Sequence, residues 1–266
     1  MTAPIPPIPR DIPDLPAVPR KPRPLPSYVP ATAVVPPFPR PLTAAFRLFT
    51  ALAAATGVTL ELLLGSPTRA LSYFSVQVNA LLALVFLISA HRAWTARRPV
   101  PSAVTGAVLL YAVISALAYH LLLAHTTPPF SMTGATTPPA PWHGEWLAAQ
   151  LLHKAAPAAA VLDWLLLTAP GRLHLRQAAT WLLYPLAYLA FSLARGELLL
   201  PGTPDRYLYP FLSVDRHGYR GALANALLLG LASYALAVLL TALDHARPNP
   251  VRRRAKTGFR LRPPVG

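Results

Sequence analysis

The chain has 266 residues, of which 54% are hydrophobic and only 12% charged, and it contains no cysteine. Low charge beside high apolar content is typical of a membrane bundle and argues against a globular enzyme, while the lack of Cys excludes disulfides, thiolate metal sites and a Cys nucleophile. The net charge of +15 is concentrated in the two tails and in alternate loops. This placement is typical of membrane orientation rather than of a nucleic-acid-binding face.

Residues 1–42 form a proline-rich segment that holds 15 of the 33 prolines. Proline removes amide donors and fixes φ, so neither a helix nor a sheet can propagate there. The sequence predicts a disordered, polyproline-like cytoplasmic tail. One interpretation is a docking arm for a proline-recognising partner; the favoured one is a solvated basic tail beside anionic lipid headgroups.

Six apolar stretches follow the tail. The clearest, 102–124 and 222–243, contain no Lys, Arg, Asp or Glu. About 20 apolar residues at a rise of 1.5 Å per residue match the roughly 30 Å hydrocarbon layer. The sequence therefore predicts an all-α, polytopic membrane protein, with a bundle of six transmembrane helices over residues 43–243 and a basic tail over 244–266. The expected helices are 43–65, 72–91, 102–124, 146–168, 179–198 and 222–243.

Three local features accompany these helices. Pro157 and Pro185 are expected to bend the fourth and fifth spans, which neighbouring helices can tolerate in a membrane. Asp163, beside Trp164, is expected to anchor the fourth span at the membrane interface.

Orientation follows from the distribution of Lys and Arg. The two tails and the loops 92–101 and 169–178 hold seventeen of the 24 basic residues. Cytoplasmic segments carry this excess, so both termini are expected in the cytoplasm and the protein in the plasma membrane. The basic tails are expected to contact anionic headgroups, and no nucleic acid partner is expected.

Polar side chains from separate helices fall at one depth, in the outer half of the predicted bundle. Such groups are costly in lipid and tend to face a cavity or one another. The alternative is that each links two helices through a hydrogen bond worth roughly 0.6–2 kcal/mol, which is the better interpretation for Asn79 taken alone. The residues expected to line an outward-facing pocket are Ser75, Asn79, His120, His153, Arg195, Tyr209 and Asn225.

Ser75 and His153 are matched in depth and form a candidate acyl-transfer pair. The imidazole would take the hydroxyl proton during attack, and Asn79, Tyr209 or Arg195 would stabilise the oxyanion. No GxSxG motif supports the pair. No HExxH or carboxylate-rich helix occurs either, so no metal or other cofactor is expected. A haem between His120 and His153 would require their helices to pack directly.

Several segments in order resemble the Pr6Pr family of bacterial six-helix membrane proteins. Residues 73–79 (YFSVQVN) resemble its YFTxQSN-like segment, and 151–164 resemble its LLHxxxP…xLDW segment. Residues 184–196 and 207–219 resemble its YPxxY…RG and YPYPFLD…GY stretches, and Asn225 falls where the family tends to have Asn.

That family is distantly similar to the eukaryotic androgen-induced and androgen-dependent tissue-factor-pathway-inhibitor-regulating proteins. These are multipass hydrolases of fatty acid esters of hydroxy fatty acids, with an intramembrane Thr and a His. The resemblance implies that Ser75 stands at the Thr position and His153 at the His position.

The leading hypothesis is thus hydrolysis of a lipid ester, with a substrate carboxylate near Arg195 and the acyl ester at Ser75. The alternative is a non-catalytic lipid-binding scaffold or small-solute carrier that uses the same pocket, with Ser75 as a helix contact. A further alternative is a membrane anchor whose proline-rich arm recruits a cytoplasmic partner.

Overall fold

The computed structural model describes residues 39–127, 129–135, 137–201, 203 and 206–248, so the prediction for most of the proline-rich tail falls outside it. Within these ranges every regular element is a helix, which confirms the predicted all-α class. Four helices of this part are long and apolar enough to cross a membrane, and they indicate a membrane protein. They are Pro41–Leu64, Phe74–Trp94, Ser102–Leu123 and Val214–Ala246.

The elements follow the predicted stretches with three differences. The predicted helix 72–91 is interrupted at Tyr73, the predicted helix 179–198 is divided near Leu182, and the predicted helix 222–243 is extended at both ends. In chain order they are α2 (Pro41–Leu64), α3 (Pro67–Ser72), α4 (Phe74–Trp94), α5 (Ser102–Ala118), η1 (Tyr119–Leu123), α6 (Gly144–Gln150), η2 (Leu151–Ala155), α7 (Ala156–Leu162), η3 (Asp163–Leu167), α8 (Leu175–Trp181), α9 (Leu183–Leu198), η4 (Pro210–Leu212) and α10 (Val214–Ala246).

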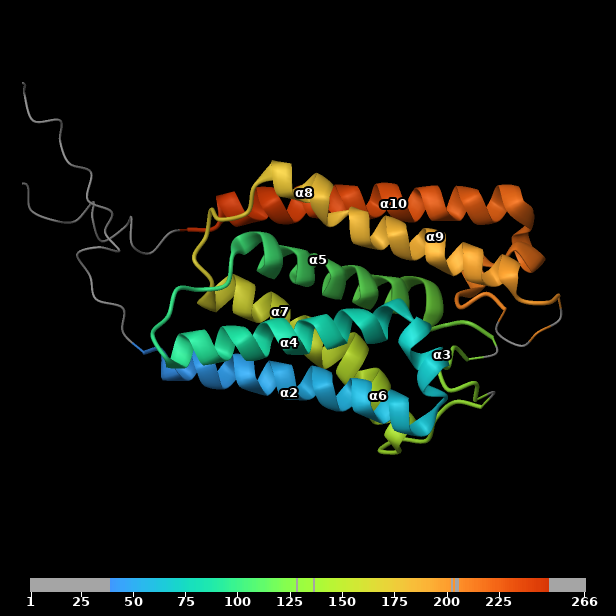
Figure 1. Ribbon diagram of the computed structural model, residues 1–266, viewed down its shortest axis with the longest axis horizontal. Helices are drawn as coiled ribbons and strands as arrows, with labels where there is room; N and C mark the ends of the chain where they lie inside the picture. Colours follow the sequence, from blue (N-terminus) through green and yellow to red (C-terminus); the bar gives the residue numbers. More distant parts are fainter. Residues whose placement is uncertain (1–38, 128, 136, 202, 204–205, 249–266) are drawn as a thin grey trace, which may run out of the picture. The chain divides into compact units, whose positions relative to one another are not determined.

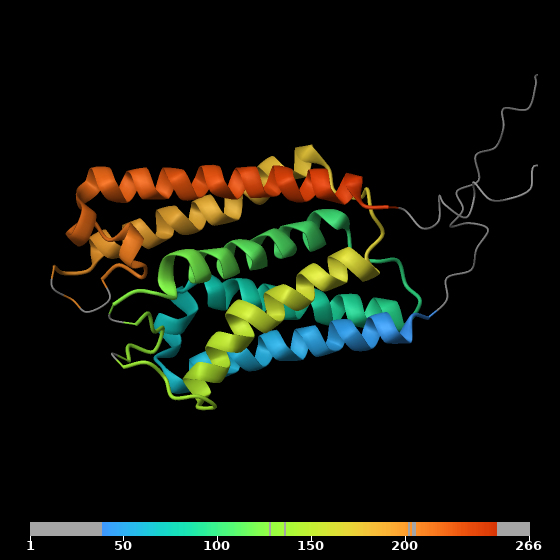
Figure 2. The same cartoon turned by 180° about the vertical axis from the view of Figure 1, so that it is seen from behind.

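Long helices that follow one another in the chain lie side by side (Figure 1). Helix α2 packs along α4, and α4 packs along α5. The run from α6 to η3 crosses α2 and α5, as Figure 2 shows from behind. Helix α10 lies beside α8 and α9. Leucines such as Leu227 and Leu228 on α10 are 66% exposed, as expected for side chains that face lipid.

One end of the bundle is held by a buried ion pair between α2 and η3. Arg47 donates from Nε to Asp163 Oδ1 at 2.7 Å and from Nη2 to Asp163 Oδ2 at 3.1 Å. Arg47 also reaches Ser89 on α4. Asp163 is buried in this contact, so the prediction that it is an interface anchor is wrong.

Asp244 closes the same end. It accepts hydrogen bonds from the backbone N–H groups of Arg172 and Leu173 at 2.7 and 2.9 Å, and from the indole of Trp164 at 3.0 Å. Arg247 pairs with it as well. The end of α10 is thereby fixed to η3 and to the loop that follows it.

The opposite end contains the interruption between α3 and α4. Tyr73 adopts an extended conformation (φ −79°, ψ 135°), so the backbone carbonyls just before it lose helical donors. Two side chains replace them: Tyr188, from α9, donates to the Ser72 carbonyl at 2.8 Å, and the nearby Gln77 donates to the Leu71 carbonyl at 2.8 Å. The break leaves Phe74 and Ser75 at the N-terminus of a new helix.

Candidate functional site

Ser75 is the second residue of α4, where backbone N–H groups have no helical acceptor. The N–H of Phe74 donates to the Tyr209 hydroxyl at 3.2 Å. The positive end of the α4 dipole also favours negative charge at this point. A hydroxyl oxygen that gains negative charge is therefore stabilised at Ser75 by its position in the helix.

His153 lies in η2 and is held by stacking. Its ring is parallel to that of Tyr119, with a centroid distance of 4.0 Å and an interplanar angle of 4°. The residue is only 3% exposed, and neither ring nitrogen has a hydrogen-bond partner. Since buried polar groups are normally bonded, two unused imidazole nitrogens favour a ligand or reactant as their partner.

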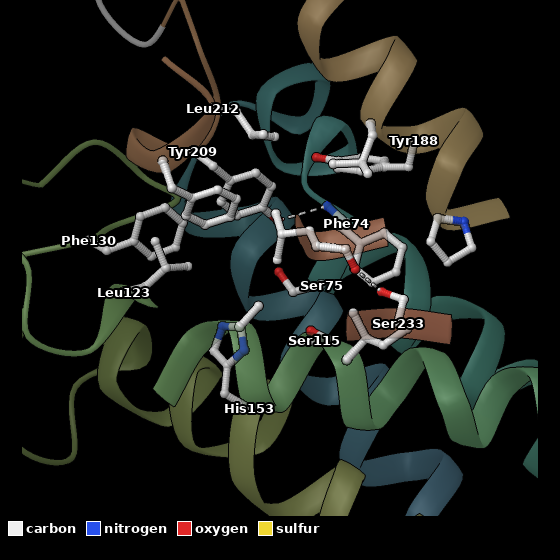
Figure 3. Close-up of a pocket in the computed structure, with 16 residues that line it drawn as sticks. Phe74, Ser75, Ser115, Leu123, Phe130, His153, Tyr188, Tyr209, Leu212 and Ser233 are labelled. Carbon is white, nitrogen blue, oxygen red and sulfur yellow. Dashed lines mark hydrogen bonds between the residues drawn. The ribbon is translucent and has the colours of Figure 1, made fainter. Parts of the chain in front are cut away.

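Ser75 and His153 are both buried and line the same cavity of about 60 Å³. Figure 3 shows both side chains directed into it from opposite walls, with the phenol of Tyr209 above them. The Ser75 hydroxyl donates to Met132 Sδ at 3.3 Å, so it is not engaged with His153. A hydrogen bond to thioether sulfur is weak, and the hydroxyl can leave it at low cost.

Asn79 fixes the two helices that carry this pair. Within η2 the N–H of Ala156 bonds the Leu151 carbonyl, and Pro157 has no N–H to offer the Leu152 carbonyl. Asn79 donates instead to the Leu152 carbonyl at 3.1 Å and to the Ser75 carbonyl at 2.8 Å. Both N–H donors of the Asn79 amide are thus used. Asn79 therefore positions the two helices and does not supply a donor for an oxyanion.

The structure places the other predicted site residues in different surroundings. Tyr209 lines the cavity. His120 is exposed and does not line it, so the arrangement in which His120 and His153 face one haem is not formed. Arg195 donates to the Arg206 carbonyl at 3.1 Å, outside the cavity wall. Asn225 donates to the Phe211 carbonyl and borders a neighbouring groove.

The cavity also contains residues that the sequence analysis did not single out. Two further serines, Ser115 on α5 and Ser233 on α10, line it beside Phe130 from the loop before α6. Ser115 Oγ is buried and has no partner. Serines in apolar helices carry no distinctive local pattern, so only the packing of the helices reveals them.

An apolar groove of about 550 Å³ runs along α5, η1 and α10 beside the cavity. The groove and the cavity have wall residues in common, among them Ile114, Phe211 and Ser233. The groove is lined almost wholly by apolar side chains, which suits a hydrocarbon chain.

Burial raises the pKa of the Tyr209 phenol above its ordinary value. The hydroxyl therefore stays protonated at neutral pH and keeps an O–H to donate, in addition to the bond it accepts from Phe74. It has the chemistry of an oxyanion donor beside Ser75.

Among the residues that the structure describes, no group of three or more His, Cys, Asp or Glu side chains is arranged to hold a metal ion. Comparison with protein-family models, with curated proteins and with solved structures gives no match. The helices and the cavity together define an α-helical membrane protein with a buried serine and histidine in one largely apolar cavity.

Proposed function

We propose that the chain is a plasma-membrane protein with six membrane-crossing segments and cytoplasmic termini, related to the Pr6Pr family. The two segments beyond the four long apolar helices are the continuous run from α6 to η3 and the pair α8–α9. The loops expected in the cytoplasm meet at one end: Arg40 at the start of α2 bonds Ala93 near the end of α4, and Asp244 bonds the 172–173 backbone. This arrangement supports the proposed topology.

We further propose that the protein hydrolyses a lipid ester at Ser75. The hydroxyl oxygen attacks the ester carbonyl while His153 takes its proton, and Tyr209 and the start of α4 stabilise the oxyanion. The C–O bond then breaks, and His153 returns the proton to the leaving alcohol. Water, deprotonated by His153, next cleaves the acyl–Ser75 ester, releasing the fatty acid and restoring the hydroxyl.

The observation that carries this proposal is the buried, unpartnered imidazole of His153 in the same cavity as Ser75. A residue that only linked helices would be expected to bond one of its ring nitrogens. The adjoining groove between α5 and α10 supplies an apolar site for the acyl chain.

The test is labelling of the purified full-length protein with a fluorophosphonate probe. We expect labelling in the wild type, none in Ser75→Ala and strongly reduced labelling in His153→Gln. Ser115→Ala is the matched control, because it removes another hydroxyl from the same cavity. Tyr209→Phe should slow labelling roughly a hundredfold, as expected for loss of one oxyanion donor. Labelling that persists unchanged in Ser75→Ala would exclude Ser75 as the nucleophile.

A second candidate function is lipid binding without catalysis. The bond from Ser75 to Met132 favours it, since the hydroxyl is already engaged within the protein. In that case the wild type would retain lipid in the groove, and the probe would label neither the wild type nor Ser75→Ala.

A further inference from the structure

His153 also borders a second pocket, which has no wall residue in common with the apolar groove. This pocket has a volume of about 240 Å³ and is lined by residues from the end of α2, the start of α6 and the loop before α6. Two carboxylates from separate helices line it, Glu61 of α2 and Glu145 of α6. The chain contains only nine acidic residues against 24 Lys and Arg, so two acids in one pocket are a notable concentration.

Glu61 is the informative member of this pair. It is 4% exposed, and its Oε2 atom has no hydrogen-bond partner. Glu145 is held by the hydroxyl of Thr133, which donates to its Oε1 at 2.7 Å. No Lys or Arg is found among the described residues of the pocket wall. A buried carboxylate in this setting lacks a positive partner, and a cationic ligand would supply one.

Aromatic rings form much of the remaining wall. Trp146, Tyr119 and Phe130 all line the pocket. Aromatic faces attract cations, and quaternary ammonium groups are recognised by such rings. Among the described residues no group of three or more His, Cys, Asp or Glu side chains is placed to hold a metal ion, so the aromatic wall favours an organic cation.

We propose that this pocket binds an alkylammonium group between Glu61, Glu145 and the ring of Trp146. The ammonium could belong to a lipid headgroup, such as that of phosphatidylcholine, or to a free amine such as choline. The site is separate from Ser75, and its occupancy does not depend on hydrolysis.

The experiment is a calorimetric titration of the full-length protein with choline, in a detergent that has no ammonium group. We expect saturable binding of choline and none of dimethylbutanol, which has the same shape without the charge. Glu61→Gln and Glu145→Gln should each weaken choline binding roughly tenfold or more, because each removes a negative charge close to the trimethylammonium group. Trp146→Leu should weaken it roughly three- to tenfold.

Matched controls separate this site from general effects. Glu197→Gln and Trp94→Leu change the same residue types outside the pocket and should bind choline as the wild type does. Ser75→Ala should also bind choline normally, so loss of probe labelling and loss of choline binding report on different proposals. A short-chain phosphatidylcholine that displaces choline at much lower concentration than free amines would identify a lipid headgroup as the ligand.

Three results would overturn the proposal. They are equal binding of choline and dimethylbutanol, wild-type affinity in both glutamine variants, or displacement of choline by Mg²⁺ at comparable concentration, which would indicate an inorganic cation site.

Discussion

Asn79 links the two helices that carry the candidate site residues Ser75 and His153. Its amide bonds the carbonyl of Ser75 and the carbonyl next to His153, so one side chain sets the spacing of the two helices that carry them. The second bond exists because Pro157 leaves the Leu152 carbonyl without a helical donor. The proline and the asparagine therefore form a complementary pair across the helix contact.

We predict that Asn79→Ala destabilises the protein by about 1–3 kcal/mol, because it leaves the buried Leu152 carbonyl without a donor. Pro157→Ala restores an N–H at that position. In the Pro157→Ala background the cost of Asn79→Ala should therefore fall by about half. The measurement is a double-mutant cycle from unfolding in mixed micelles, and additive effects of the two substitutions would contradict the pairing.

The sequence predicts a depth for each residue, which stays a prediction, but it does not predict side-chain direction. Ser75, His153 and Tyr209 belong to different elements and line one cavity. His120 was misplaced because adjacent residues on a helix point about 100° apart, and its neighbour Tyr119 is the one that meets His153. The π-helical turn at η1 changes the phase further, and hydropathy does not reveal such turns.

At the scale of elements, the buried pair of Arg47 and Asp163 joins α2 to η3. Both residues lie in largely apolar helices and are buried together. Removal of water from two charges is costly, and the pair offsets this cost only while both members are present. The contact therefore fixes how α2 and η3 align, whereas its net contribution to the free energy of folding is small.

We predict that Arg47→Met lowers the free energy of unfolding by about 3–5 kcal/mol, because it leaves the Asp163 carboxylate buried and unpaired. The double variant Arg47→Met with Asp163→Leu should recover most of this loss, since no unpaired charge remains. Thermal unfolding followed by circular dichroism checks both. Arg98→Met, at an exposed position, is the control and should change stability by less than about 0.5 kcal/mol.

The long helices could be predicted from apolar runs, but the interruption at Tyr73 could not. Residues 68–78 (TRALSYFSVQV) contain no Pro or Gly, so no local signal marks the interruption at Tyr73. The break is supported by distant residues. Tyr188 donates a hydrogen bond to the Ser72 carbonyl, and the ring of Tyr209 packs edge-on against that of Tyr73 with a centroid distance of 5.8 Å. A helix terminus that depends on tertiary partners becomes visible only once those partners are placed. The bend of α10 differs, because it lies at Gly218, whose φ of 66° favours glycine and which is a local signal in the sequence.

At the scale of the whole molecule, the two proposed ligand sites meet at His153. The apolar cavity lies on one side of this residue and the acidic, aromatic pocket on the other, and Leu123 and Phe130 border both spaces. A lipid with its acyl chain in the groove and an ammonium headgroup in the pocket would bring its linking ester past the imidazole. Headgroup selection would then act directly at the place where the proposed chemistry occurs.

Membrane orientation decides from which side such a headgroup enters. The proposed topology places the loop before α6 outside and the turn after α4 in the cytoplasm. The protein has no cysteine, so single cysteines can be introduced without a background signal. Ala140 and Thr95 are exposed positions in these two segments and are suited to substitution.

We predict that Ala140→Cys reacts with a membrane-impermeant maleimide in intact cells, whereas Thr95→Cys reacts only after the cells are made permeable. The reason is that the excess of Lys and Arg in the tails and in the loops 92–101 and 169–178 retains those segments on the cytoplasmic side. The reverse pattern would place the Glu61 pocket toward the cytoplasm and remove the basis for an outward-facing site. Labelling of both positions in intact cells would contradict a membrane crossing by the helix Ser102–Leu123, which lies between them, and with it the proposed count of six segments.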